Sequence, residues 1–462
     1  MNIEASIDDL SDSWECVELR NVVSKLVDGS HNPPKKQVSG QPMLSARNID
    51  NNQIVFDKYR FIADEDFDRE SARTRIEPGD VLLTIVGTIG RTAVIPEGLD
   101  NFTLQRSVAV LTPEGVLPKF LMYQLEAPSV QRYFEENARG TAQKGVYLKT
   151  LGQTPIKVAP LKQQKRIVAE IEKQFSRLDE AVANLKRVKA NLKRYKAAVL
   201  KAAVEGKLTE EWRKQHPDVE PADKLLERIL AERREKWQGR GKYKEPVAPD
   251  TTDLPELPEG WVWVRLDAIA AIKGGITVDK KRKDPTARLV PYLRVANVQR
   301  GYLDLSEMKK IEAPLSSIED LRLLLGDILF NEGGDRDKLG RGWVWEGQIE
   351  DCIHQNHVFR ARPYLNEVNS KLISWWGNSF GQYYFLRVGK QTTNLASINM
   401  TKLSEFPMPL PPFEEQARIE IEVERLLSVV VVAEGQVETN LRRADRLRQS
   451  ILKQAFTGKI LC

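Results

Sequence analysis

The chain has 462 residues, of which 41% are hydrophobic and 29% charged, and its formal net charge is +5. This length exceeds one ordinary core, so we expect two or more domains, and the composition is typical of a protein that folds in water. Cys16, Cys352 and Cys462 are too far apart for metal-ligand spacing, and no apolar run approaches the roughly 18 residues of a membrane helix. We therefore expect no disulfide framework, no signal peptide and a cytoplasmic location.

Residues 1–160 are predicted to form a mixed α/β domain. The β-branched runs VLLTIVG at 81–87 and SVAVLT at 107–112 are typical of strands, and Gly79-Asp80 predicts a turn into the first run. A short helix is expected over Lys119–Asn137. Basic and amide-rich loops interrupt this half, and such side chains can donate hydrogen bonds to base edges and phosphates. The candidate DNA-contacting residues here are Lys35, Lys36, Thr88, Arg91, Gln105, Arg106, Thr141, Gln143 and Lys144.

Residues 161–208 are predicted to form a long helix. Pro160 precedes it, and Gly206 is placed to end it. Apolar residues recur mostly at steps of four and three, which is the heptad seam of a coiled coil. The residues of this seam are Ile171, Phe175, Leu178, Val182, Leu185, Leu192, Tyr195 and Val199.

Residues 209–256 join this first part of the chain to a second. Ala222–Trp237 has the pattern of a charged amphipathic helix, and the polar stretch Gly239–Asp253, which contains glycines and prolines, indicates an exposed linker.

The second half of the chain repeats the first. Trp14-x-x-Val17-x-Leu19 recurs 247 residues later from Trp261, and Gly79-Asp80-Val81-Leu82 recurs at the same spacing from Gly326. The segment that begins at Leu200-Lys201 recurs 252 residues later from Leu452-Lys453. Ordered matches at a nearly constant spacing indicate a duplication. They predict a second mixed α/β domain over 257–412 and a second long helix over 413–462.

The second domain carries its own basic and amide-rich loops, at places that correspond to those of the first. Gln355 matches Gln105, and the segment 391–394 matches 141–144. Taken singly, each loop is more simply explained as an ordinary solvated loop. The recurrence of such loops at matched positions favours two domains that recognise different halves of a DNA site. The candidates are Lys280, Lys281, Arg336, Lys338, Gln355, Asn356, His357, Lys390, Gln391, Thr392 and Asn394.

The charges of the two long helices favour pairing within one chain. Residues 162–201 carry 12 Lys/Arg and 4 Asp/Glu, whereas residues 414–453 carry 7 and 8. Unlike charges favour pairing between the two helices over pairing of the first helix with its own copy. The predicted fold class is therefore α+β: two mixed α/β domains joined by two long helices that form an intramolecular antiparallel coiled coil with pseudo-two-fold symmetry.

The combined pattern resembles the specificity subunits of type I restriction-modification systems. Leu257-Pro258-Glu259-Gly260-Trp261 is similar to the start of a recognition domain in that family. Each domain ends in proline followed by a Gln-x-Arg-Ile helix start, at Gln164–Ile167 and Gln416–Ile419. The helix ends Leu192–Thr209 and Gln449–Lys459 also resemble those of the family, and the likeness covers nearly the whole chain.

This resemblance implies a subunit that reads DNA without catalysing a reaction. Each domain would be a target recognition domain for one half of a split asymmetric site, with the helices setting the spacer. Two modification subunits would carry S-adenosylmethionine and the methyl-transfer chemistry, and restriction subunits, if present, would use ATP and magnesium. The resemblance implies no catalytic, cofactor-binding or metal-binding residue in the chain itself, and no membrane partner.

Two other functions stay open at the level of sequence. The first alternative is a self-contained DNA methyltransferase. Asn32-Pro33-Pro34-Lys35 is similar to the Asn-Pro-Pro-aromatic motif of DNA amino-methyltransferases, but lysine cannot stack on a flipped base. A coiled-coil interaction protein that does not bind DNA is the second alternative, and salt-dependent DNA binding would separate it from a DNA reader. Cys352, His354 and His357 lie close in sequence, but a chance cluster is the simpler interpretation than a zinc site.

Overall fold

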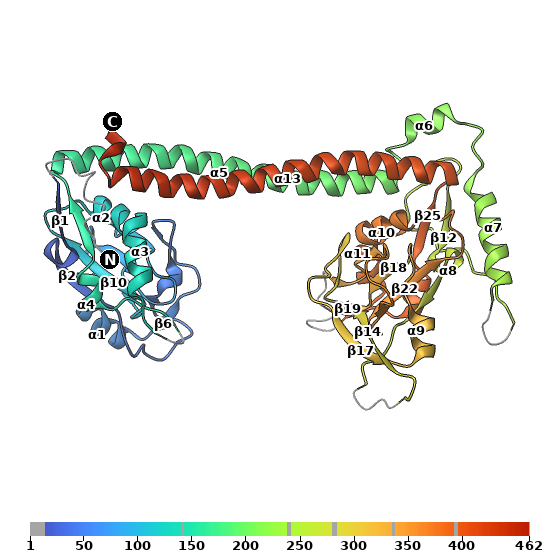
Figure 1. The fold of residues 1–462 in the computed structure, drawn as a ribbon, viewed down its shortest axis with the longest axis horizontal. Helices are drawn as coiled ribbons and strands as arrows, with labels where there is room; N and C mark the ends of the chain where they lie inside the picture. The colour runs from blue at the N-terminus through green and yellow to red at the C-terminus, as the bar shows by residue number, and fades with distance from the viewer. Residues whose placement is uncertain are drawn as a thin grey trace. The chain divides into compact units, whose positions relative to one another are not determined.

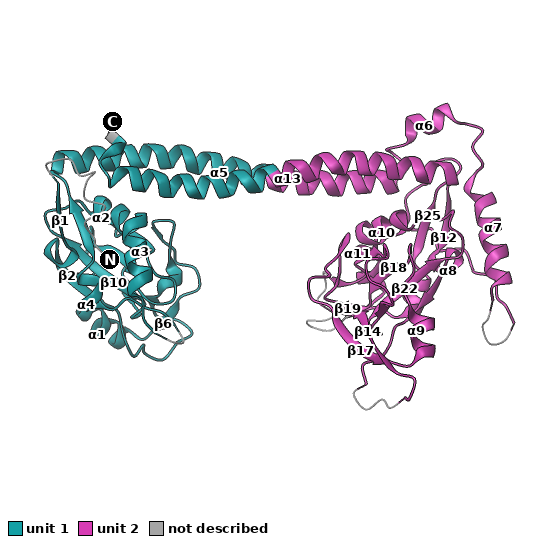
Figure 2. Ribbon diagram, in the orientation of Figure 1, with its two compact units in different colours: residues 1–188, 436–462 teal, residues 189–435 magenta. Residues whose placement is uncertain are grey.

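The computed structural model describes residues 14–140, 143–237, 242–279, 284–334, 338–391 and 396–461. Contacts divide the chain into two compact units (Figure 2): unit 1 is residues 1–188 and 436–462, and unit 2 is residues 189–435. Each unit contains one mixed α/β domain and part of both long helices. The division therefore cuts across the two helices, which the sequence analysis predicted as segments separate from the domains. Among the described residues, no helix is long and apolar enough to cross a membrane.

Unit 1 is built on a four-stranded antiparallel sheet in the order β2-β10-β7-β8, which consists of β2 (Val23–Asp28), β10 (Val108–Pro113), β7 (Val81–Thr84) and β8 (Thr92–Val94). The run at 81–87 and the run at 107–112 therefore form strands, as predicted. In a second sheet, β3 (Gln41–Leu44) pairs antiparallel with β6 (Arg60–Ile62) and parallel with β9 (Thr103–Leu104). Two strand pairs complete the unit: β1 (Glu15–Glu18) with β11 (Pro155–Val158), and β4 (Ile49–Asp50) with β5 (Gln53–Ile54).

Unit 1 also contains several short helices (Figure 1). They are η2 (Leu19–Asn21), η3 (Ala46–Asn48), α1 (Asp64–Thr74), α2 (Pro118–Leu125), α3 (Pro128–Asn137), α4 (Leu148–Gly152) and, near the C-terminus, η5 (Lys459–Leu461). The single helix expected over Lys119–Asn137 is wrong in one respect, because the segment forms the two helices α2 and α3. Pro128 begins the second helix, since proline lacks the N–H that an uninterrupted helix would need at that position.

Unit 2 repeats each sheet of unit 1 and, among the described residues, has one further sheet of three short strands. Its central sheet has the order β13-β22-β18-β20, which consists of β13 (Ala270–Lys273), β22 (Val358–Pro363), β18 (Ile328–Asn331) and β20 (Gly342–Val344). The second sheet pairs β14 (Arg288–Leu293) antiparallel with β17 (Lys309–Ala313) and parallel with β21 (Ile353–His354). The remaining strands are β12 (Val262–Arg265) with β25 (Pro407–Leu410), β15 (Val298–Gln299) with β16 (Tyr302–Leu303), and β19 (Gly333–Gly334), β24 (Ala396–Ser397) and β23 (Lys390–Gln391) in one sheet.

The helices of unit 2 include two that belong to the segment between the halves. The full set is α6 (Glu210–Gln215), α7 (Ala222–Glu235), α8 (Leu266–Ile269), α9 (Leu315–Leu321), α10 (Ser370–Ser379), α11 (Gly381–Val388) and α12 (Met400–Ser404). Helix α7 corresponds to the amphipathic helix expected over Ala222–Trp237. Its apolar face packs into the core of the unit through Ala222, Leu225 and Ile229, all of which are buried.

The two long helices are α5 (Leu161–Val204) and α13 (Phe413–Ala455), and they run antiparallel. In unit 1, Ile171 near the start of α5 and Ile451 near the end of α13 belong to one core. In unit 2 the pairing is reversed, because Val199 near the end of α5 shares a core with Val423 near the start of α13. The predicted intramolecular antiparallel coiled coil is thus confirmed, although Tyr195, assigned to its seam, is 46% exposed.

Candidate nucleic-acid interface

In unit 1, backbone hydrogen bonds join several of the predicted loops into one continuous surface. The amide of Arg106 donates to the carbonyl of Ser30 at 2.9 Å. The amide of Ile85 donates to Ser107 O, and that of Val146 donates to Ile85 O, each at 2.9 Å. These three bonds place the loops after β2, β7, β9 and α3 side by side, and we call this surface the rim of unit 1.

Unit 2 builds the same surface with the equivalent bonds. The amide of Asn356 donates to Ile276 O at 3.0 Å, and the amide of Glu332 donates to His357 O at 3.0 Å. The amide of Ile398 donates to Glu332 O at 2.8 Å. The rim of unit 2 is therefore a second copy of the rim of unit 1, with the same backbone and different side chains.

One glycine in each unit makes the rim possible. A Cβ at Gly29 would lie 2.2 Å from Leu104 O, and a Cβ at Gly275 would lie 2.0 Å from His354 O. Neither position accepts a side chain without a shift of the backbone, because both neighbouring atoms are carbonyl oxygens. The two glycines thus allow β2 and β13 to pass close to the strands that lead into Gln105 and Gln355.

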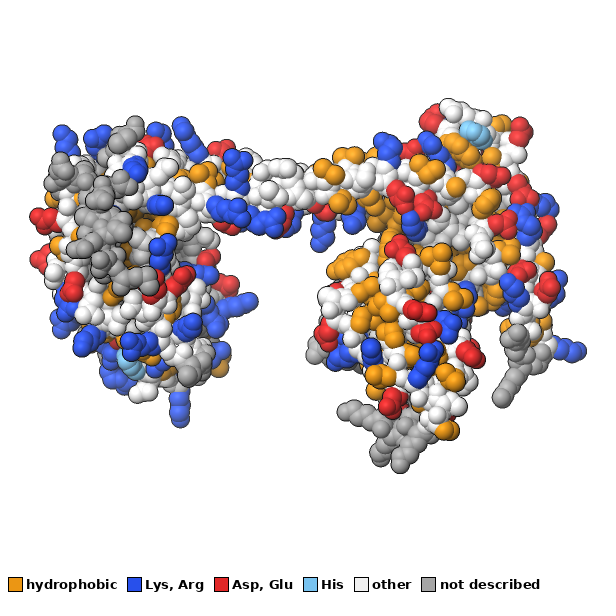
Figure 3. Space-filling model, in the orientation of Figure 1, with side chains coloured by type: hydrophobic (Ala, Val, Ile, Leu, Met, Phe, Trp, Pro, Cys, Tyr) orange, Lys and Arg blue, Asp and Glu red, His pale blue; other side chains and the backbone are white. Residues whose placement is uncertain are grey.

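Most candidates of the first half lie on the surface of unit 1. The side chain of Gln105 is half-buried, and Arg91 forms an ion pair with Asp50 at 3.0 Å. Thr141 lies outside the described residues. The exposed candidates are Lys35, Lys36, Thr88, Arg91, Arg106, Gln143 and Lys144. Figure 3 shows Lys and Arg side chains both along α5 and over the end of unit 1 away from that helix.

The candidates of the second half are more mixed in their placement. Gln355 and Asn356 are half-buried, His357 is exposed, and Lys338 is half-buried. Lys390 and Gln391 form β23, where Lys390 is exposed. Five candidates lie outside the described residues, namely Lys280, Lys281, Arg336, Thr392 and Asn394.

The structure brings together loops that are far apart in sequence. In unit 1 the amide of Gly87 donates to Lys144 O at 3.1 Å, so the loop with Thr88 and the loop with Gln143 are neighbours. In unit 2, β19 and β23 both pair with β24, which joins the corresponding loops. The loop of Lys35 and Lys36 is tied instead to β6, because Gln37 N donates to Phe61 O at 2.9 Å.

The sequence-based candidates omit two charged residues of the rims, Arg139 and Glu332. Arg139 is exposed, and its backbone amide and carbonyl both bond to Gly145 at 2.9 Å, which places it beside Lys144. Glu332 accepts a hydrogen bond from His357, with Nδ1 and Oε2 2.5 Å apart. Arg139 directly precedes Gly140, so a slightly wider boundary for that loop would have included it among the candidates. Glu332 directly precedes Gly333, but its negative charge does not indicate contact with DNA.

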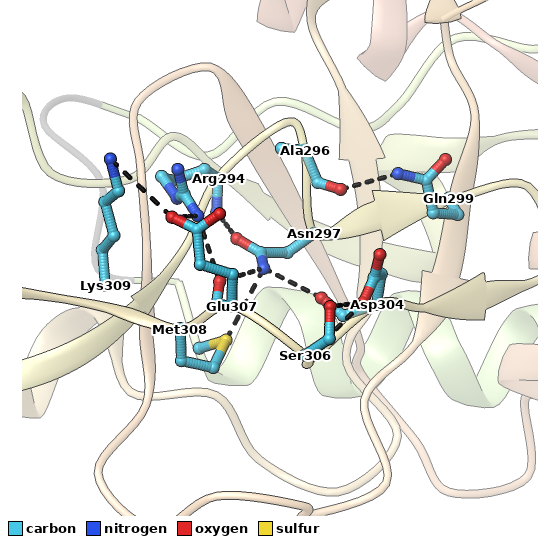
Figure 4. Close-up of polar contacts among 9 residues, drawn as sticks. All are labelled: Arg294, Ala296, Asn297, Gln299, Asp304, Ser306, Glu307, Met308 and Lys309. Carbon is cyan, nitrogen blue, oxygen red and sulfur yellow. Dashed lines mark hydrogen bonds and ion pairs between the residues drawn. The ribbon is translucent and has the colours of Figure 1, made fainter. Parts of the chain in front are cut away.

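A buried asparagine fixes the turn behind each rim. Asn297 is 3% exposed; its Oδ1 accepts from Arg294 N at 3.0 Å, and its Nδ2 donates to Asp304 O at 2.9 Å and Glu307 O at 3.1 Å (Figure 4). The turn follows β14, whose last residue, Leu293, accepts the amide of Gln355. Asn48 bonds in the same way in unit 1, to Ser45 N, Val55 O and Asp57 O.

The histidines of unit 2 differ sharply in their surroundings. His354 is fully buried, Nδ1 lies 2.6 Å from Val358 O, and burial lowers the pKa of His354 to about 4. Burial also raises the pKa of the Cys352 thiol to about 12. His357 is exposed and bonded to Glu332, so it does not face the other two side chains. Within the described ranges, no group of three or more His, Cys, Asp or Glu could hold a metal ion.

The chain is similar to specificity subunits in sequence and in fold. The family described as Type I restriction modification DNA specificity domain matches residues 12–194. The chain is 28% identical over 233 residues to the EcoBI specificity subunit of Escherichia coli, covering 48% of this chain and 49% of that relative. It is 23% identical over 428 residues to the EcoKI specificity subunit of Escherichia coli strain K12, covering 91% and 82%.

Other relatives match over a smaller part. A putative MjaX specificity subunit of Methanocaldococcus jannaschii is 27% identical and covers 45% of this chain and 48% of its own length. The chain thus spans about half the length of the first two curated relatives it matches.

Two solved structures show the same fold over almost the whole chain. One, from work on complex assembly of the type I R-M system, gives a TM-score of 0.62 at 20% identity and covers 97% of this chain and 99% of its own. The HsdS subunit from Thermoanaerobacter tengcongensis gives 0.50 at 18% identity, covering 97% and 98%. With its duplicated domains and paired helices, the chain is similar in sequence and in fold to the specificity subunits of type I restriction-modification systems.

Proposed function

We propose that this chain is the non-catalytic subunit that determines the DNA sequence on which a type I system acts. Unit 1 and unit 2 would each read one half of a bipartite, asymmetric DNA target. The observation that carries this proposal is the pair of rims. Their backbones are joined by equivalent hydrogen bonds, while the side chains at matched positions differ. Two copies of one scaffold with different side chains are what two different half-sites require, because base edges are distinguished by their donors and acceptors.

The exposed basic and amide side chains of the rims support DNA as the ligand. Arg106, Lys144 and Arg139 lie together on the rim of unit 1 and are exposed. Lysine and arginine neutralise phosphates, and arginine, asparagine and glutamine also read base edges in the major groove. We expect the affinity to fall steeply with salt concentration, because phosphate contacts release counterions.

The long helices are proposed to scaffold the partners and to set the spacer. Apolar side chains on the outer face of α13 are exposed, with Ile421 at 56%, Val429 at 66% and Val432 at 73%. Apolar residues exposed on a helix that is already paired suggest a surface for a further protein. The proposed partners are two methyltransferase subunits, which would bind S-adenosylmethionine, and restriction subunits, which would use ATP and magnesium. This chain would bind none of these cofactors itself.

The test is to express the chain with a methyltransferase subunit of its own system and to map methylated adenines across a genome. We expect one bipartite motif with a fixed spacer, which disappears when this chain is omitted. If the methyltransferase alone methylates the same sequence, the proposal is wrong.

A further inference from the structure

The two rims differ in side chains at positions where their backbones are equivalent. The residue that follows the shared glutamine is Arg106 in unit 1 and Asn356 in unit 2. Both follow a short strand of equivalent pairing, β9 or β21, and precede a strand of the central sheet. Arg106 is exposed and Asn356 is half-buried, so both reach the surface.

Four backbone bonds hold these two positions in the same way. The preceding glutamine donates to the last residue of the neighbouring strand, Gln105 to Leu44 O and Gln355 to Leu293 O, each at 2.9 Å. The bonds from the amides of Arg106 and Asn356 to the loops after β2 and β13, described above, fix the next residue. The side chains at 106 and 356 therefore leave matched points of two similar surfaces.

We infer that Arg106 and Asn356 are equivalent base-reading residues, with Arg106 specifying a guanine in one half-site and Asn356 an adenine in the other. This inference rests on the proposed function. The arginine fork donates two hydrogen bonds to O6 and N7 of guanine, and the amide of asparagine matches N6 and N7 of adenine. The same scaffold thus presents a guanine reader in unit 1 and an adenine reader in unit 2.

In unit 2 a neighbouring pair positions the amide of Asn356. His357 Nδ1 lies 2.5 Å from Glu332 Oε2, and because a carboxylate only accepts, Nδ1 carries the hydrogen. The other ring nitrogen, Nε2, faces Asn356 Nδ2 at 3.5 Å. A neutral ring accepts there, which leaves Asn356 Oδ1 and its second N–H for adenine. Glu332 and His357 are therefore positioning residues, and unit 1 has Ile85 and Ser107 in their places.

The test exchanges the two residues one at a time in the full chain, expressed with the methyltransferase subunit, and maps the methylated motif. Arg106→Asn is expected to change one guanine to adenine in the half-site of unit 1, and Asn356→Arg one adenine to guanine in that of unit 2. Each preference is expected to shift by about tenfold or more, the discrimination that one bidentate contact gives. Each variant carries a residue that the equivalent backbone already holds, and the half-site of the other unit serves as an internal control for folding.

The outcomes separate this inference from the proposed function. If the unaltered chain gives no bipartite motif, the proposed function fails. If it gives one and both exchanges leave every base of that motif unchanged, the inference on Arg106 and Asn356 is overturned. If an exchange weakens methylation at all positions without a new preference, the residue has only a structural or phosphate-binding part, and the inference is overturned for that unit.

The positioning of Asn356 is tested separately with Glu332→Ile and Glu332→Gln. Isoleucine is the residue of unit 1 at this point of the backbone and cannot accept from His357, whereas the glutamine oxygen can. Glu332→Ile is expected to relax the adenine preference about threefold or more, since one hydrogen bond of the reading geometry is lost. Glu332→Gln is expected to retain the preference. Equal behaviour of the two variants would contradict the positioning of Asn356 by Glu332.

Discussion

At the scale of single residues, unit 2 contains a buried histidine, His354, at a position where unit 1 has an apolar residue. His354 ends β21, whereas Leu104 ends the equivalent strand β9. Burial lowers the pKa of His354 from 6.5 to about 4, so the folded state holds the ring neutral. The unfolded chain takes up a proton below about pH 6.5, which stabilises it relative to the folded state. The contribution of His354 is therefore fully present above that pH and is lost as the pH falls toward 4.

The variant His354→Leu tests this pH dependence. We expect the stability of unit 2 in the unaltered chain to fall between pH 6.5 and pH 4, by up to about 3 kcal/mol from this group. In His354→Leu that part of the fall should disappear, although the loss of the bond to Val358 O lowers stability at neutral pH. Thermal unfolding at pH 7.5 and pH 5 measures both effects. An equal loss of melting temperature on acidification in both proteins would contradict the assignment.

The buried asparagine behind the rim gives a second prediction at this scale. Asn297→Ala removes three hydrogen bonds, so the amide of Arg294 and the carbonyl of Asp304 lose their side-chain partner, whereas Glu307 O still accepts from Arg294 Nη2 at 3.0 Å. We expect a loss of about 2–3 kcal/mol in the free energy of unfolding. Gln299→Ala is the control, because within the described residues its side-chain amide bonds to Ala296 O alone, near the surface, and its loss should cost less than about 0.5 kcal/mol. Similar unfolding curves for the two variants would count against a structural role for Asn297.

At the scale of elements, the pairing of the long helices depends on more than the apolar seam. Arg448 of α13 forms an ion pair with Asp179 of α5, and its guanidinium lies 4.2 Å from the ring centroid of Phe175. These contacts fix the register of the antiparallel pair in unit 1. The polarity of this ion pair is opposite to the net charges of the two helices, because the arginine lies on the more acidic α13 and the aspartate on the basic α5.

The variant Arg448→Ala tests the contribution of this contact to the helix pair. Loss of the ion pair and of the stacking on Phe175 is expected to destabilise unit 1 by about 1 kcal/mol. Arg446→Ala, on an exposed face of the same helix, is the matched control and should change stability by less than about 0.5 kcal/mol. Chemical denaturation of the two variants makes the comparison, and an effect of equal size at both sites would exclude a specific role for Arg448.

The heptads and the duplication made most elements predictable from sequence, and the exceptions have local causes. The seam failed at Tyr195, which is exposed, because heptad spacing alone cannot show which apolar residues meet a partner. The split of the expected helix at Pro128 follows from a single residue. The rims were predicted only as separate loops. What joins them, such as Gly29 under Leu104 O, depends on close approach between residues distant in sequence, which no local pattern encodes.

At the scale of the whole molecule, the proposed spacer function predicts a change of spacing without a change of half-sites. Helices α5 and α13 would be shortened together by seven residues, Val182–Val188 and Thr439–Asp445, segments matched through the Asp179–Arg448 pair. Seven helical residues span about 10 Å, so the spacer should shorten by about three base pairs. Methylome mapping reads the result. Altered half-sites at an unchanged spacing would contradict the proposal that the helices set the spacer. Shortening α5 alone serves as the mismatched control.

The central claim is that the two rims read two different halves of one DNA site, and photocrosslinking tests it most directly. A duplex with the mapped motif would carry 5-iodouracil in one half-site or the other, bound to the full chain together with the proposed methyltransferase subunits. Mass spectrometry would then identify the crosslinked peptides. We predict that one half-site crosslinks to peptides of the unit 1 rim, around Gln105–Ser107, and the other to those of the unit 2 rim, around Gln355–His357. Crosslinks from both half-sites to the same unit would contradict the account.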